Sequence, residues 1–270
     1  TKKVAIKKFP MYDKSSYMSF KNEIKILKKI KHKNLVKIYD YYKDRRNIYL
    51  VMEYAPLGDL DNYTRCLYKK HSSLDDDFVD NVISQVTEGI DYLHKNKIIH
   101  RDIKTSNILV FEKNLFKITD FGISKCMDSN RFAYTNIGTP YYMAPEIVCG
   151  QPYDFSVDYW ALGCMIYKLL TKKYPFEARN IGALVLRIKR GMYNSSNIPY
   201  KYKQLLDKLL QSNRKDRGNK DTVYDYLKKI FFSKNDTFDV IKDKELPKMK
   251  NKPTLNMIYN DYKIIPDVNK

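Results

Sequence analysis

The sequence contains no run of about 18 apolar residues, the length that a membrane-spanning helix requires. It has no basic start followed by an apolar stretch and a small-residue cleavage site, which is the pattern of a secretory signal. No two of its cysteines form a C-x-x-C pair; they are Cys66, Cys126, Cys149 and Cys164. This spacing argues against zinc and favours reduced thiols, so we expect a cytoplasmic or nuclear location and no membrane partner.

Acidic residues are scarce beside basic ones, because 31 Asp and Glu stand against 50 Lys and Arg and leave a formal net charge of +19. Such a surplus occurs in proteins that bind nucleic acid, acidic membranes or acidic substrates. Here lysine and asparagine are spread along the whole chain, which favours solvated surface lysines. No RNP, zinc-finger or basic-zipper pattern is present. We therefore expect no nucleic acid partner, and a nucleic-acid-associated protein remains an alternative that rests on charge alone.

Hydrophobic residues make up 43% of the chain, which is enough for a real core. In residues 16–30 the apolar positions recur at i, i+4 and i+7, the period of an amphipathic helix. Short β-branched runs around this helix predict strands at 4–9, 35–42 and 47–54. The first 55 residues therefore predict a small unit of one helix and three strands.

After residue 56 the pattern becomes mainly helical. Segment 156–171 is apolar nearly all round, which indicates a buried helix. Further predicted elements are helices at 73–96, 179–191, 201–212 and 221–232 and short strands at 108–112 and 115–119. Residues 123–143 are loop-like. Residues 233–270 are rich in Lys, Asp and Asn and contain three prolines, so we expect a tail that lies on the domain or in solvent.

Two stretches carry the chemistry, HRDIKTSNILV at 100–110 and ITDFGISK at 118–125. In phosphoryl transfer, Asp102 can accept the proton of a substrate hydroxyl. Asn107 and Asp120 offer the hard oxygen ligands that Mg²⁺ prefers. The motif D-F-G or A-P-E alone often occurs by chance. The motifs HRDxxxxN, D-F-G and A-P-E together in this order rarely do.

On these motifs the chain resembles a eukaryotic protein kinase domain over about residues 2–232. The resemblance implies an α+β, two-lobed fold with a small, mostly β lobe that holds one regulatory helix and a larger, mainly helical lobe. The expected parts are 1–55, 56–232 and the tail 233–270. The resemblance also implies ATP and Mg²⁺ as cofactors and a protein substrate. The sequence does not indicate an oligomeric state.

The resemblance assigns a set of residues to the nucleotide. Lys7 of V-A-I-K would pair the α- and β-phosphates, and Glu23 would hold Lys7. Asp59 would reach the ribose or, alternatively, cap the next helix. The adenine pocket would be formed by Ala5, Leu109, the gatekeeper Met52 and the hinge residues Glu53, Tyr54 and Ala55.

Other residues receive structural roles from the same resemblance. A regulatory spine that rests near Asp158 would consist of Leu27, Ile38, His100 and Phe121. We expect His100 to be a packed, hydrogen-bonded residue with no role in proton transfer. Glu146 would form a buried ion pair with Arg217, although Gly218 stands where the family usually has proline.

Two residues favour Ser/Thr over Tyr as the acceptor. Lys104 lies two residues after Asp102, where it would contact the γ-phosphate, and Thr139 resembles the threonine that bridges to the catalytic Asp. GTPYYMAPE at 138–146 and PFEARNIGALVLRI at 175–188 are similar to NIMA-related kinases. Ala144 for the usual Ser and the lack of a following coiled coil are departures. A calcium/calmodulin-type or STE-type kinase is the competing interpretation.

Regulation would depend on Arg101, because an arginine beside the catalytic Asp can clamp an activation-loop phosphate. Thr135 is the best candidate for phosphorylation. Weaker candidates are Ser124, Ser129 and Tyr134.

The V-A-I-K stretch at 4–7 follows only three residues, too few for the glycine-rich flap that would cover the phosphates in this family. We therefore expect a longer protein, and we expect the chain as written to bind ATP weakly and to transfer phosphate poorly. The alternative is a pseudokinase that serves as a scaffold. Against it, the residues that degenerate kinases tend to lose are present: Lys7, Glu23, Asp102, Asn107 and Asp120.

Overall fold

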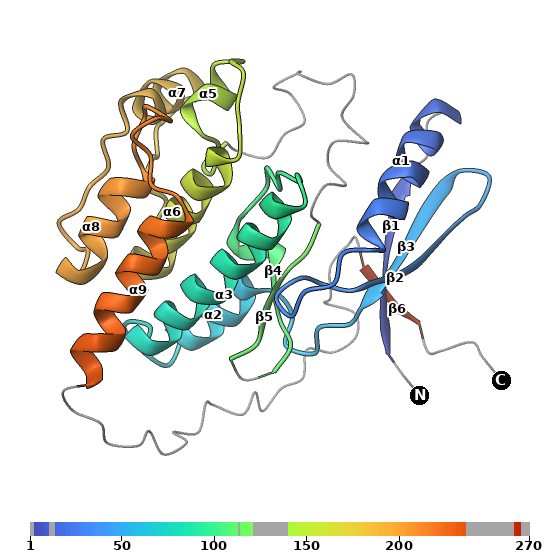
Figure 1. The fold of residues 1–270 in the computed structure, drawn as a ribbon, viewed down its shortest axis with the longest axis horizontal. Coiled ribbons are helices and arrows are strands. Elements are labelled where there is room, and N and C mark those ends of the chain that lie inside the picture. The colour runs from blue at the N-terminus through green and yellow to red at the C-terminus, as the bar shows by residue number, and fades with distance from the viewer. Residues whose placement is uncertain (1–2, 11–13, 113, 121–139, 236–261, 266–270) are drawn as a thin grey trace.

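The computed structural model describes residues 3–10, 14–112, 114–120, 140–235 and 262–265 (Figure 1). An antiparallel sheet with one long helix beside it forms one end of the molecule, and the other end is mainly helical (Figure 1). This arrangement is the predicted α+β, two-lobed fold. Among the described residues, no helix combines the length and apolar character needed to cross a membrane.

The sheet has the strand order β2-β3-β1-β6. Strand β1 (Val4–Pro10) pairs antiparallel with β3 (Asn47–Glu53), which pairs with β2 (Ile38–Lys43). Burial alternates along β3, so one face of the sheet points toward the core. The strand predicted at 35–42 begins three residues later, because the chain on either side of Leu35 instead bonds to Ile118 of the large lobe. The Val36 N–H donates to the Ile118 carbonyl, and the Ile118 N–H donates to the Asn34 carbonyl.

Helix α1 (Lys14–Leu27) packs its apolar side against this sheet. The Phe20 ring lies 5.7 Å from that of Phe9 in β1 and 6.2 Å from that of Tyr41 in β2. Ile24 and Leu27 are also buried. The helical spacing read from the sequence therefore identified the buried face correctly.

Strand β6 (Tyr262–Ile265) pairs antiparallel with the outer edge of β1, from Val4↔Ile265 to Lys7↔Tyr262. Part of the predicted tail thus joins the sheet of the small lobe. The sequence signal for this strand is weak, since only four residues are involved and the edge of β1 supplies the hydrogen-bonding partners.

The large lobe is built around α6 (Ser156–Thr171), which has the predicted bounds and is buried on nearly all sides. A Cβ atom on Gly163 would come within 2.9 Å of Leu210, so glycine allows α6 and α8 to approach closely. The other helices are α2 (Leu60–Tyr68), α3 (Asp76–Lys95), α5 (Pro145–Val148), α7 (Ile181–Arg190), α8 (Tyr200–Leu209) and α9 (Lys220–Asn235). A 3₁₀ turn, η1 (Thr105–Asn107), leads into the two-stranded sheet of β4 (Ile108–Val110) and β5 (Phe116–Ile118).

Candidate active site

Asp102 is held by two neighbours in the loop between α3 and β4. Its Oδ2 atom accepts hydrogen bonds at 2.8 Å from Asn107 Nδ2 and from Lys104 Nζ. Asn107 Nδ2 also donates to the backbone carbonyl of Asp102 at 2.8 Å. The Asp102 side chain is 41% exposed, so its carboxylate is fixed in direction and still accessible to a substrate hydroxyl.

The start of this loop is anchored to α6 by a carboxylate with no solvent exposure. Asp158 accepts from the backbone N–H of His100 at 2.9 Å and from that of Arg101 at 2.8 Å. His94 Nε2 lies 2.8 Å from the same carboxylate. Arg101 has a φ of 69°, a left-handed conformation that is costly for a residue with a Cβ, and the two Asp158 bonds hold it there.

His100 is a structural histidine, as predicted. It is 1% exposed, its Nδ1 accepts from the Asp102 N–H at 3.1 Å, and its Nε2 lies 2.8 Å from the Thr119 carbonyl oxygen. Because Nδ1 accepts, Nε2 carries the proton and donates. The ring therefore joins the catalytic loop to the strand end that precedes Asp120.

Lys7 and Asp120 come together from opposite lobes. Lys7 Nζ lies 2.8 Å from Asp120 Oδ2, and the two side chains are only 19% and 13% exposed. Asp120 has a φ of 63°, which turns the chain sharply after β5. The side chain of Glu23, the predicted partner of Lys7, lies outside the described part of the molecule.

The residues assigned to the adenine pocket lie where the two lobes meet. Ala5 and Met52 pair directly between β1 and β3, and both are buried. Leu109 in β4 bridges to Asp59 just after the hinge. The remaining hinge residues, Glu53, Tyr54 and Ala55, follow Met52 in sequence.

Asp59 has the alternative role that the sequence allowed. Its side chain is 1% exposed and caps α2 by accepting from the backbone and side-chain nitrogens of Asn62 at 2.8 Å each. Burial raises the pKa of Asp59 above its ordinary value, and the Asn62 bonds oppose that rise. The ribose contact remains a prediction.

The chemistry of Asn107 and Asp120 fits a Mg²⁺ ion. The Asn107 Nδ2 bonds to Asp102 leave its carbonyl oxygen for a cation, and Asp120 supplies a carboxylate. Within the described ranges, no group of three His, Cys, Asp or Glu side chains could hold an ion. These two ligands therefore suit an ion whose remaining ligands are phosphate oxygens and water.

The predicted pair of Glu146 and Arg217 is confirmed. The two contacts are bidentate, at 2.6 and 2.9 Å, and the side chains are 6% and 0% exposed. Arg217 also lies over the Trp160 ring, 5.1 Å from its centre. Gly218 in the usual proline position does not prevent this geometry, and its N–H donates to the Lys208 carbonyl at 2.9 Å.

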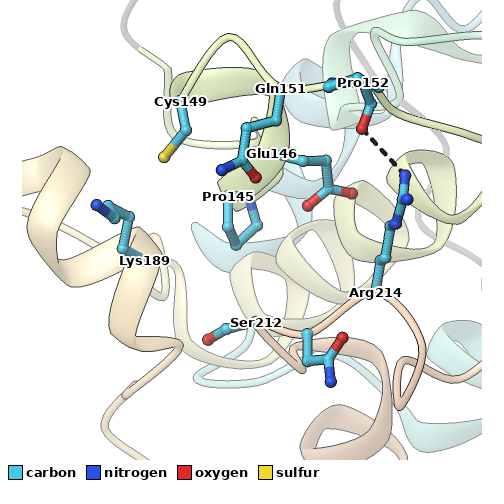
Figure 2. Close-up of a pocket in the computed structure, with 9 residues that line it drawn as sticks. Pro145, Glu146, Cys149, Gln151, Pro152, Lys189, Ser212 and Arg214 are labelled. Carbon is cyan, nitrogen blue, oxygen red and sulfur yellow. Dashed lines mark hydrogen bonds between the residues drawn. The ribbon is translucent and has the colours of Figure 1, made fainter.

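A cavity of about 490 Å³ lies beside this ion pair (Figure 2). In Figure 2, Arg214 reaches the Pro152 carbonyl, which accepts from its Nη1 at 3.0 Å. The lining contains no residue of the catalytic loop or hinge, so this cavity is not the nucleotide site. It is lined by Pro145, Glu146, Cys149, Gln151, Pro152, Lys189, Ser212, Asn213 and Arg214.

Of the predicted regulatory spine, the structure describes Leu27, Ile38 and His100, and all three are buried. Several other predicted residues lie outside the described ranges. The residues outside these ranges are Phe121, Thr135, Thr139 and the weaker phosphorylation candidates Ser124, Ser129 and Tyr134.

Sequence reasoning missed two ion pairs next to the site. Lys117 in β5 donates to both carboxylate oxygens of Glu53 at 2.8 and 2.9 Å, which ties the hinge to the large lobe. Lys168 in α6 pairs with Asp61 in α2. The sequence contains one indication of the second pair, because Lys168 is the single lysine in the apolar segment 156–171.

Comparison with known proteins decides the family. Residues 1–231 match the protein kinase domain family. This chain belongs to the protein kinase family. The kinase domain is also similar to a solved structure described as Rad53 1–466 in complex with AMP-PNP, with a TM-score of 0.70, 29% identity and coverage of 83% of this chain and 57% of that one.

Among its curated relatives, the kinase domain is 36% identical over 194 residues to the probable serine/threonine-protein kinase nek2 of Dictyostelium discoideum, covering 70% of this chain and 46% of that protein. It is 38% identical to the serine/threonine-protein kinase Nek8 of Danio rerio (70% and 27% covered) and 37% identical to the serine/threonine-protein kinase ULK1 of Homo sapiens (75% and 20%). The predicted similarity to NIMA-related kinases is therefore confirmed. The chain spans less than half the length of these relatives.

Proposed function

We propose that this chain is the catalytic domain of a Ser/Thr protein kinase that transfers the γ-phosphoryl group of Mg-ATP to protein hydroxyls. The observation that carries the proposal is the position of Asp102, which is fixed by Asn107 and Lys104 and remains open to solvent. The relatives, which are named as serine/threonine-protein kinases, support the acceptor type.

In the proposed reaction, the substrate hydroxyl oxygen attacks the γ-phosphorus while the bond to the bridging oxygen of ADP breaks. Asp102 orients that hydroxyl and accepts its proton at Oδ1, because Oδ2 already accepts from Asn107 and Lys104. Lys104 Nζ, which lies 2.8 Å from Oδ2, is placed to contact the γ-phosphoryl oxygens. Lys7 binds the α- and β-phosphates, and its partner Asp120 keeps it at the junction of the lobes.

Asn107 and Asp120 would hold Mg²⁺, which supplies charge neutralisation for the phosphates when bound. Asn107 has a second function that does not require the ion, because its amide nitrogen fixes the direction of the Asp102 carboxylate. Glu53, bonded to Lys117, orients the hinge backbone that would meet the adenine edge.

The test is phosphate transfer from labelled ATP to casein or histone by the full-length protein. We expect Asp102→Asn to lower transfer by about 100-fold or more, since a general base contributes at least that factor. Lys7→Met should likewise lower transfer by about 100-fold or more. Transfer by the wild type with full activity in both variants would show that the assigned site is wrong, and an inactive wild type would favour the scaffold.

A further inference from the structure

The polar side of α6 that faces the catalytic loop carries one cation, Lys168. Its side chain is 19% exposed, although it lies in a helix that is otherwise mostly apolar. Lys168 Nζ forms an ion pair with Asp61, donates to Thr105 Oγ1 at 3.2 Å and lies 3.4 Å from the Tyr174 hydroxyl. The lysine therefore joins α2 and the catalytic loop, which are distant from it in sequence, to the segment that follows α6.

The hydroxyl group of Thr105 uses its full hydrogen-bonding capacity in this cluster. It donates to Asp61 Oδ1 at 2.7 Å and accepts from Lys168. Its remaining lone pair faces the Tyr142 hydroxyl at 3.3 Å, so Tyr142 is the donor of that bond. Because Thr105 follows Lys104 directly, these bonds fix the catalytic loop beside the residue that would contact the γ-phosphate.

Aromatic contacts extend the cluster to the segment that precedes α5. The rings of Tyr141 and Tyr174 stack at 4.1 Å, and the Tyr142 ring meets Tyr174 edge-on at 5.6 Å. Lys168 Nζ lies 4.8 Å from the centre of the Tyr174 ring. Tyr141 and Tyr142 belong to residues 136–146, which the kinase resemblance assigns to the substrate-facing segment, and both are partly exposed.

The charges of the cluster support one another. Burial by itself lowers the pKa of Lys168, but the contacts with Tyr142 and Asp61 outweigh burial and raise it. Burial raises the pKa of Tyr142 to about 12, so its hydroxyl keeps the proton that it donates. Burial raises the pKa of Asp61 as well, but the bonds from Lys168 and Thr105 more than offset this and leave it lowered.

We propose that Lys168 is a positioning residue for the protein substrate, because it bonds to Thr105 and Tyr174, the two residues that contact Tyr142 of the substrate-facing segment. This inference rests on the proposed function. Lys168 serves the protein substrate and not the nucleotide, since the nucleotide side of the site is held by separate pairs. Those pairs are Lys7 with Asp120 and Glu53 with Lys117.

Kinetics with the full-length protein separate positioning from general stabilisation. Lys168→Met should lower kcat/KM for casein by about tenfold, the loss expected for one charge-assisted hydrogen bond, and should leave KM for ATP within about twofold. Lys168→Arg should restore most of the activity, because the cation is retained.

A matched control is available on α8. Lys201 also pairs with two carboxylates, Asp76 at 3.0 Å and Asp80 at 3.2 Å, and lies 4.5 Å from the centre of the Tyr202 ring. Lys201→Met should leave both kinetic parameters unchanged. An equal fall in this control, a parallel rise in KM for ATP, or full activity of Lys168→Met would overturn the proposal.

Hydrogen exchange tests the same inference without relying on catalysis. In Lys168→Met, the amides of 103–108 and 140–148 should exchange faster together, while those of α8 should not change. Tyr142→Phe, which removes one hydroxyl and keeps the ring, should produce a smaller change in the same two segments. Unchanged exchange in both segments would overturn the inference about Lys168, even if the wild type transfers no phosphate. Failure of this inference is therefore distinguishable from failure of the proposed function.

Discussion

Lys7 Nζ and Asp120 Oδ2 lie 2.8 Å apart, although the two residues belong to different lobes and are 113 positions apart in sequence. One side chain comes from the middle of β1 and the other from the turn after β5. Because both side chains are largely shielded from water, their attraction is stronger than that of a surface pair. The relative position of the two lobes therefore affects the groups assigned to the phosphates and to Mg²⁺.

The two residues should behave as one functional unit. Lys7→Met and Asp120→Asn should each reduce phosphate transfer by about 100-fold or more, and the double variant should be little worse than either single variant. Transfer rates of the four proteins at saturating ATP measure this coupling. Strictly multiplicative losses would show that the two side chains act independently.

The Glu146–Arg217 pair should dominate the stability of its region. Arg217→Met leaves a buried carboxylate without its partner and should lower the free energy of unfolding by about 3–5 kcal/mol. Chemical denaturation of the full-length protein provides the measurement. Arg214→Met is the control, because its side chain is 44% exposed and its loss should change stability by less than about 1 kcal/mol. A comparable loss in both variants would contradict the special role of the buried pair.

His32 should make stability depend on pH. Burial lowers the pKa of His32 below its ordinary value of 6.5, and its Nδ1 accepts from the Asn34 N–H at 3.2 Å. The folded state therefore binds the proton less tightly than the unfolded state, so the contribution of His32 to stability falls as pH drops through 6.5. Urea unfolding at pH 7.5 and 5.5 should show a smaller pH effect in His32→Gln than in the wild type. An identical pH effect in the two proteins would refute this, and His71→Gln, at an exposed site, is the control.

Phosphorylation of Thr135 should raise activity through Arg101. The Arg101 guanidinium lies 5.2 Å from the centre of the Tyr153 ring, and within the described part of the chain its buried Nε has no hydrogen-bonding partner. A phosphate would supply that partner. We expect phosphatase treatment to lower wild-type activity by about tenfold, the equivalent of one such hydrogen bond, and Thr135→Ala to remove the difference. Ser129→Ala should retain the difference in activity between the phosphatase-treated and untreated proteins. Equal activity of the treated and untreated wild-type proteins would exclude this form of regulation.

Sequence patterns predicted the parts of the molecule in which chemistry or burial is local. Helix α6 is an example, because apolar residues on all sides require a helix that is surrounded by protein. The motifs around Asp102 and Asp120 likewise identified the candidate active site, since their residue types and spacing are specific to phosphoryl transfer.

The contacts that join distant segments were not predictable in the same way. Lys168 and Asp61 are 107 positions apart, and Glu53 and Lys117 are 64 positions apart. In a chain with 50 basic residues, each lysine has many acidic candidates, and only the packing of the helices selects its partner. Asp59 shows the reverse case, because both of its roles were visible in the sequence and the three-dimensional environment favoured the helix cap.

Helix α6 holds the catalytic loop at two places, through Asp158 near its first turn and Lys168 near its last. The two residues are ten positions apart, which corresponds to about 15 Å of helix, nearly three turns. The number of helical residues between Asp158 and Lys168 therefore sets where the catalytic loop begins and where it meets the substrate-facing segment. Deleting one residue between the two anchors would rotate one against the other by about 100°. The spacing of this helix is thus as much a property of the active site as any side chain within it.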